Sequence, residues 1–177
     1  DKIDILAAGA QKWLLGPAGV GILYCRREIL DQIRVTVVGA DSVINAEDYL
    51  NYDFTLKPDS TRFESGTGNR VGLVGLKASL ELLFEVGCQE ITQRILQITD
   101  YFCSAAQCKG YHIYSPRGEG EKSGIISFYH DKYRCEEIRD FLRGYGVFTV
   151  IRDHRLRISP HFYNTLEEMA KVIHLLP

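Results

Sequence analysis

The sequence predicts an α/β segment over residues 1–71, followed by an α+β domain with a mostly antiparallel sheet over residues 72–177. Two short apolar runs separated by a Gly-Pro turn indicate strands in the first part. From residue 72 the expected order of elements is α-α-β-β-α-β-β-α, which is typical of helices packed on one face of a small sheet.

Apolar runs and turn residues define the first part. Residues 3–8 form an apolar run ending in glycine, which predicts a buried strand, and residues 20–26 predict a second strand. One or two helical turns are expected over residues 27–33. Residues 34–70 show no clear period, so we expect an ordered but irregular connection, and irregular stretches of this length are usually functional or disordered.

Helical periodicity dominates the second part. Apolar residues three and four positions apart predict four helices. The first is closed by Gly87, the third by Gly144 or Gly146, and the last begins at a capping box of Thr165 and Glu168. The expected strands cover residues 111–115, 124–130, 147–153 and 155–159.

Composition excludes several classes of protein. The formal net charge is −2, whereas nucleic-acid binding calls for a basic surplus. No apolar run approaches the roughly 18 residues of a membrane span. The five cysteines are odd in number and lack a CxxC pair, so we expect reduced thiols in the cytoplasm rather than disulfides. The five histidines lack metal-ligand spacing, so no metal site is expected.

Lys12 is the first candidate for chemistry. It follows a predicted strand and lies on a turn of small residues. Partial desolvation there favours the neutral amine, which can attack a carbonyl. The alternative is a solvated lysine at the end of a strand, and the local context alone favours that interpretation.

Three motifs in register link the chain to a known family. They are KWLLGPAGVGILYCRREIL from Lys12, RFESGTGN over residues 62–69 and LRISPHFYNTLEEM over residues 156–169. Together they resemble the class V aminotransferases, which are pyridoxal phosphate (PLP) enzymes of fold type I and include cysteine desulfurases and isopenicillin-epimerase-like proteins. The resemblance implies that residues 1–71 are the C-terminal part of the PLP-binding large domain and residues 72–177 the small C-terminal domain.

The resemblance also implies roles for individual residues. Lys12 forms a Schiff base with PLP and then serves as base and acid at the substrate α-carbon. Thr67 reaches the PLP phosphate of the neighbouring subunit, which implies a homodimer with a shared active site. From the residues alone, the Gly-Thr-Gly-Asn stretch around Thr67 is either an anion-binding nest or a plain turn.

Arg157 is expected to bind the α-carboxylate of the substrate. In the strand predicted over residues 155–159, Arg155 and Arg157 share one face. Alternation does not distinguish these two arginines, and Arg152 is a further rival close by. The resemblance selects Arg157, whose guanidinium can hold a carboxylate through two parallel hydrogen bonds.

Two positions near Lys12 depart from the family pattern. Gln11 stands where histidine is usual, and Gly9 stands where desulfurases often have a phosphate-binding serine. Gln11 still has an amide that can donate a hydrogen bond, so it is retained as a cofactor-binding candidate.

The cysteines depart from the desulfurase pattern. Desulfurases carry a nucleophilic cysteine between the last two strands of the small domain, and residues 147–159 contain none. We therefore expect no desulfurase activity. Cys88, Cys103 and Cys108 lie on or beside predicted helices and are expected to be packing residues.

Two functions from different classes are consistent with these observations. The first is a fragment of a PLP-dependent enzyme with aminotransferase, epimerase or lyase chemistry on an amino acid. The family's acid at the pyridine nitrogen, its stacking aromatic and its first phosphate loop are not among these residues, so the isolated fragment is expected to be inactive. The second is a binding or scaffold module that keeps the fold without the chemistry.

Overall fold

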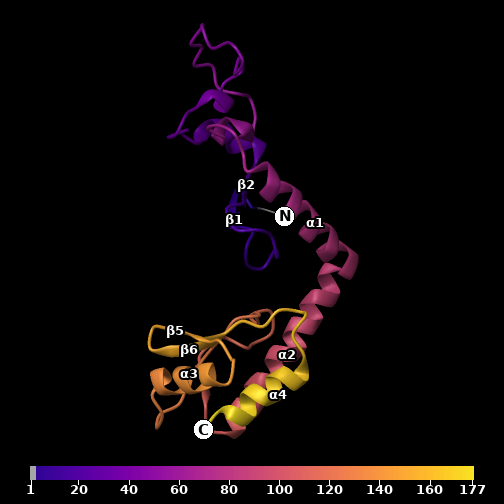
Figure 1. Ribbon diagram of the computed structural model, residues 1–177, viewed down its shortest axis with the longest axis vertical. Helices are drawn as coiled ribbons and strands as arrows, with labels where there is room; N and C mark the ends of the chain where they lie inside the picture. The colour runs from indigo at the N-terminus through magenta and orange to yellow at the C-terminus, as the bar shows by residue number, and fades with distance from the viewer. Residues whose placement is uncertain (1–2) are drawn as a thin grey trace. The chain divides into compact units, whose positions relative to one another are not determined.

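The computed structural model describes residues 3–177 and divides the chain into two compact units, Asp1–Glu85 and Val86–Pro177 (Figure 1). The expected boundary lay after residue 71, whereas the helix that follows it, α1 (Arg70–Val86), lies almost wholly in the first unit. The reason is packing, because Leu76 of α1 joins Ala10 and Val20 in a small hydrophobic core.

The first unit contains an antiparallel pair of strands, β1 (Ile5–Gly9) and β2 (Gly21–Cys25). Both strands were predicted, but the expectation that the first of them, β1, is buried is wrong. Its residues are all exposed, with Ile5 at 50%. Within residues 3–177, β2 is the only strand that pairs with β1. The remaining elements are short 3-10 helices: η1 (Arg27–Gln32), η2 (Ala40–Ser42) and η3 (Ser60–Phe63).

The second unit is a four-stranded antiparallel sheet with three helices. The sequence predicted this sheet with four helices, and the first of the four, α1, lies almost wholly in the first unit. The strand order is β3-β4-β6-β5. The elements are α2 (Cys88–Cys108), β3 (His112–Ile113), β4 (Ile126–Tyr129), α3 (Cys135–Gly144), β5 (Val150–Arg152), β6 (Arg155–Ile158) and α4 (Leu166–Leu175). Figure 1 shows α2 and α4 side by side, and the two helices are in contact.

Local signals account for two boundaries in this unit. The capping box at the start of α4 is confirmed, since the Thr165 hydroxyl accepts the Glu168 N–H and the Glu168 carboxylate accepts the Thr165 N–H. Strands β5 and β6 are joined by Asp153 and His154, with φ of +47° and +58°. Two consecutive residues in the left-handed region give the tight type I′ hairpin that matches the twist of paired strands.

The core of the second unit lies on one face of this sheet. Phe128 of β4 and Leu156 of β6 are fully buried and stand opposite each other in the strand register. Phe128 packs edge-on against Phe102 of α2, with ring centres 5.0 Å apart. The buried cluster also draws on α3 and α4, so the helices cover the face that carries the alternate apolar residues of the strands.

We predict that Leu156→Ala lowers the free energy of unfolding of the second unit by about 3 kcal/mol, because it leaves a cavity under Phe128. Urea unfolding followed by far-UV circular dichroism measures this loss. Lys132→Ala, at an exposed position, is the control and should change stability by less than about 0.5 kcal/mol. Equal stability of the two variants would contradict this account of the core.

Candidate functional site

Lys12 lies on the turn that follows β1. Two backbone hydrogen bonds close this turn: the Leu15 N–H donates to the Lys12 carbonyl at 3.0 Å, and the Gly16 N–H donates to the Ala10 carbonyl at 2.9 Å. Lys12 itself is exposed. The desolvation considered from the sequence is therefore not seen within residues 3–177, and the turn presents Lys12 as an accessible primary amine.

Glycines of α1 let the segment after Lys12 lie directly on the helix. A Cβ atom at Gly72 would be 2.2 Å from Cγ2 of Val20, and one at Gly75 would be 2.6 Å from Cγ of Pro17. Real Cβ atoms do not approach other atoms so closely, so both positions need the absence of a side chain. The packing fixes the chain from Pro17 to Val20 against α1.

Asn69 connects the two motifs that carry the candidate residues. Its side-chain carbonyl accepts the Gly72 N–H at 2.9 Å and caps the N-terminus of α1. Its side-chain amide donates to the Gly19 carbonyl at 3.4 Å. The Thr67 loop and the segment that follows the Lys12 turn therefore meet at the first turn of α1. We did not single out Asn69 from the sequence, although an asparagine before an apolar helical pattern is a known cap signal.

Thr67 lies in an open loop whose backbone N–H groups are available as hydrogen-bond donors. It is exposed, and no atom lies within 4 Å of a Cβ placed at Gly66. Within residues 3–177, the backbone N–H groups of Gly66, Thr67 and Gly68 have no hydrogen-bond acceptor. Free amides beside a hydroxyl are the donor set that an anionic phosphate requires, so this loop fits such a group.

Gln11 and Gly9 are linked sterically. Gln11 is exposed, and its side chain folds back over Gly9, so that a Cβ at Gly9 would be 2.8 Å from Gln11 Oε1. The lack of a side chain at position 9 therefore leaves room for the carboxamide at position 11. The glycine at position 9 and the glutamine at position 11, which both depart from the family pattern, are therefore sterically compatible with each other.

Arg157 lies on the sheet face opposite the core of the second unit. Its neighbours Leu156 and Ile158 are buried, so β6 alternates as predicted. The Nε of Arg157 is buried, with no hydrogen-bond partner within residues 3–177. A buried donor without a partner is costly, and such groups are usually satisfied by a ligand or water.

The rival arginine on the same strand already has partners. Arg155 forms an ion pair with Asp153, and its guanidinium carbon lies 3.6 Å from the centre of the Tyr114 ring. Its charge is therefore balanced locally. This difference favours Arg157 over Arg155 as the group available to a substrate.

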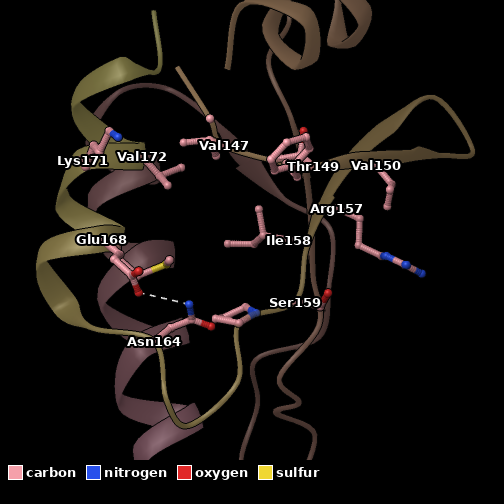
Figure 2. Close-up of a pocket in the computed structure, with 14 residues that line it drawn as sticks. Val147, Thr149, Val150, Arg157, Ile158, Ser159, Asn164, Glu168, Lys171 and Val172 are labelled. Carbon is pink, nitrogen blue, oxygen red and sulfur yellow. Dashed lines mark hydrogen bonds between the residues drawn. The ribbon is translucent and has the colours of Figure 1, made fainter. Parts of the chain in front are cut away.

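A groove of about 340 Å³ lies between β6, the segment 146–150 and α4 (Figure 2). On its α4 side, the Asn164 amide donates to Glu168 at 3.0 Å. Figure 2 shows Ile158 pointing toward α4 and Arg157 pointing the opposite way, with its guanidinium directed out of the groove. Arg157 therefore lines one edge of the groove, and its charged end points away from α4.

The cysteines are dispersed and none lies between β5 and β6. Burial raises the pKa of the Cys103 and Cys135 thiols, which keeps both protonated and poorly nucleophilic. Cys103 is a packing residue as expected, but that expectation is wrong for Cys88 and Cys108, which are exposed near the two ends of α2. The two-residue turn between β5 and β6 leaves no room for a mobile loop bearing a thiol.

The family model for aminotransferase class-V matches residues 2–172. The chain belongs to this family. An uncharacterised aminotransferase of Bacillus subtilis, YcbU, is 30% identical over 171 residues, which cover 97% of this chain and 44% of that protein. This chain therefore spans less than half the length of a curated relative it matches.

Solved structures show the same fold. The apo structure of a cysteine desulfurase from Thermococcus onnurineus is similar with a TM-score of 0.86 at 23% identity, covering 97% of this chain and 46% of that one. A variant of the enzyme C-DES, with glycine covalently linked to its PLP cofactor, is similar with a TM-score of 0.81 at 26% identity, covering 98% and 45%.

Within residues 3–177, every helix falls short of the length and apolarity that crossing a bilayer requires. The same residues contain no cluster of three His, Cys, Asp or Glu side chains arranged to hold a metal ion.

We predict that Gly72→Ala destabilises the first unit by roughly 1–3 kcal/mol, because the new methyl group overlaps Val20. Trp13, the single tryptophan, lies in this unit, so urea unfolding followed by its fluorescence reports the change. Gly66→Ala is the matched control, since its Cβ meets no atom within 4 Å. Unchanged stability of Gly72→Ala would show that α1 does not need this close approach.

Proposed function

We propose that this chain is part of a longer PLP-dependent enzyme that acts on an amino acid, with Lys12 as the residue that holds the cofactor covalently. The observation that carries the proposal is an exposed primary amine on a closed turn, within a chain that matches the class-V family over residues 2–172. The similar C-DES variant carries PLP with a linked amino acid, which supports the same cofactor here. The proposal covers aminotransferase, epimerase and lyase chemistry.

The residues of the first unit fit this cofactor. The Gln11 carboxamide can donate a hydrogen bond to the cofactor of its own chain, and the Thr67 hydroxyl with the free amides around it suits the phosphate of the cofactor held by a second copy. When bound, PLP withdraws electrons from the substrate α-carbon. Lys12 would hold the cofactor and, once released from it, move a proton to or from that carbon through Nζ.

Arg157 would fix the orientation of the substrate. Its planar guanidinium takes a carboxylate through two parallel hydrogen bonds, so it sets direction as well as charge. The unpartnered Nε supports this role, because a bound α-carboxylate supplies the missing acceptor. Orientation matters because the bond to be broken at the α-carbon must stand perpendicular to the cofactor ring.

We further propose a homodimer in which Thr67 contributes to the phosphate site of the second copy, and a cytoplasmic location. Thr67 is exposed and available for such a contact. The location is supported by the thiols, since all five cysteines are free.

We predict that borohydride reduction of the full-length, PLP-loaded enzyme, followed by peptide mapping, finds the pyridoxyl group on Lys12. The physical reason is that only a primary amine can bond the cofactor aldehyde in a form that borohydride fixes. A Lys12→Ala variant is the control and should retain no label in this peptide. A label on another lysine would overturn the assignment.

We predict that Arg157→Lys raises KM and lowers kcat/KM by roughly tenfold or more, about 1.4 kcal/mol, because lysine keeps the charge and loses the bidentate geometry. Steady-state kinetics on the full-length enzyme measures the change. Arg155→Lys is the matched control on the same strand face and should have little effect, since Asp153 and Tyr114 already engage that arginine. The assignment is wrong if Arg157→Lys behaves like the unmodified enzyme while Arg155→Lys is crippled.

A further inference from the structure

Three arginines share the open face of the four-stranded sheet. Arg155 and Arg157 lie two residues apart on β6, so they are on the same face. Arg152 of β5 stands directly opposite Arg155 in the strand register, which makes it a diagonal neighbour of Arg157. Diagonal neighbours in an antiparallel pair lie about 7–8 Å apart, within reach of long side chains, whereas like charges directly opposite each other are unfavourable.

The middle arginine is already neutralised. Arg155 is paired with Asp153, and the Tyr114 ring lies 3.6 Å from its guanidinium carbon. These contacts hold the side chain in place and balance its charge. Arg155 therefore separates the other two guanidinium groups without offering a free one of its own.

Arg152 and Arg157 lack an acidic partner within residues 3–177. Arg152 is exposed and donates a hydrogen bond to the Ile151 carbonyl at 3.0 Å. Arg157 has its buried, unpartnered Nε. At the other end of this face, Asp131 is already paired with His112 at 2.8 Å. Two guanidinium groups on one surface are thus left without a counter-charge.

We propose that Arg152 binds a second acidic group of the substrate, which makes the substrate class amino acids with a carboxylate in the side chain. This inference rests on the proposed function, in which Arg157 holds the α-carboxylate. An acidic amino acid supplies both missing counter-charges at once. A neutral amino acid pairs with Arg157 alone and leaves Arg152 without an acidic partner.

The test is titration of the full-length, PLP-loaded enzyme with amino acids, followed by the absorbance of the cofactor. Aspartate is compared with asparagine and glutamate with glutamine, because each pair differs in charge and little in shape. We expect the acids to bind about tenfold more tightly than the amides, the factor that corresponds to one hydrogen bond between charged groups.

Variants of Arg152 separate specificity from fold. Arg152→Gln should bring the ratio of the two dissociation constants close to one, and Arg152→Lys should retain part of it because the charge remains. Arg139→Gln is the matched control, since Arg139 lies on α3, pairs with Asp140 and should keep the ratio unchanged.

Equal binding of acids and amides by the unmodified enzyme, or an Arg152→Gln variant that keeps the preference, overturns this inference and leaves the proposed function standing. No absorbance change with any amino acid overturns the proposed function, and this inference with it.

Discussion

The alternation of β6 ties the core of the second unit to its candidate substrate face. Leu156 and Ile158 enter the hydrophobic cluster, so the residues between and beside them, Arg155 and Arg157, must lie on the other side of the sheet. A slip of one residue in the register would exchange the two sets and bury both guanidinium charges. The free-energy cost of burying them would strongly destabilise the fold. The stability of the core and the position of the arginines are therefore one constraint.

A comparable dependence holds in the first unit, where α1 supports both candidate motifs. The helix accepts the segment after Lys12 because Gly72 and Gly75 have no side chains in the way. Its cap, Asn69, closes the loop that carries Thr67 and also contacts Gly19. The segment that follows Lys12 and the open loop that carries Thr67 are thus both held at the same helix end.

The spacing of apolar residues, together with the glycine and capping residues at element ends, predicted the secondary structure well. The helices ending near Gly87 and Gly144, the capping box at Thr165 and the strand alternation at β6 are all present. These features depend on residues close in sequence, whose effect on the backbone is local. Burial was predicted less well, as the exposed β1 shows, because burial depends on which other segments cover a strand.

The sequence by itself determined the family, the order of elements and the identity of Lys12, Thr67 and Arg157 as candidates, since motif spacing and periodicity are properties of the chain alone. Only the tertiary structure decided which arginine side chains already have partners within the protein. Asp153 and Tyr114 engage Arg155, and the Nε of Arg157 is buried without a partner. The physical reason is that charge balance and desolvation depend on neighbours brought together by strand pairing, and spacing along the chain does not reveal which neighbours those are.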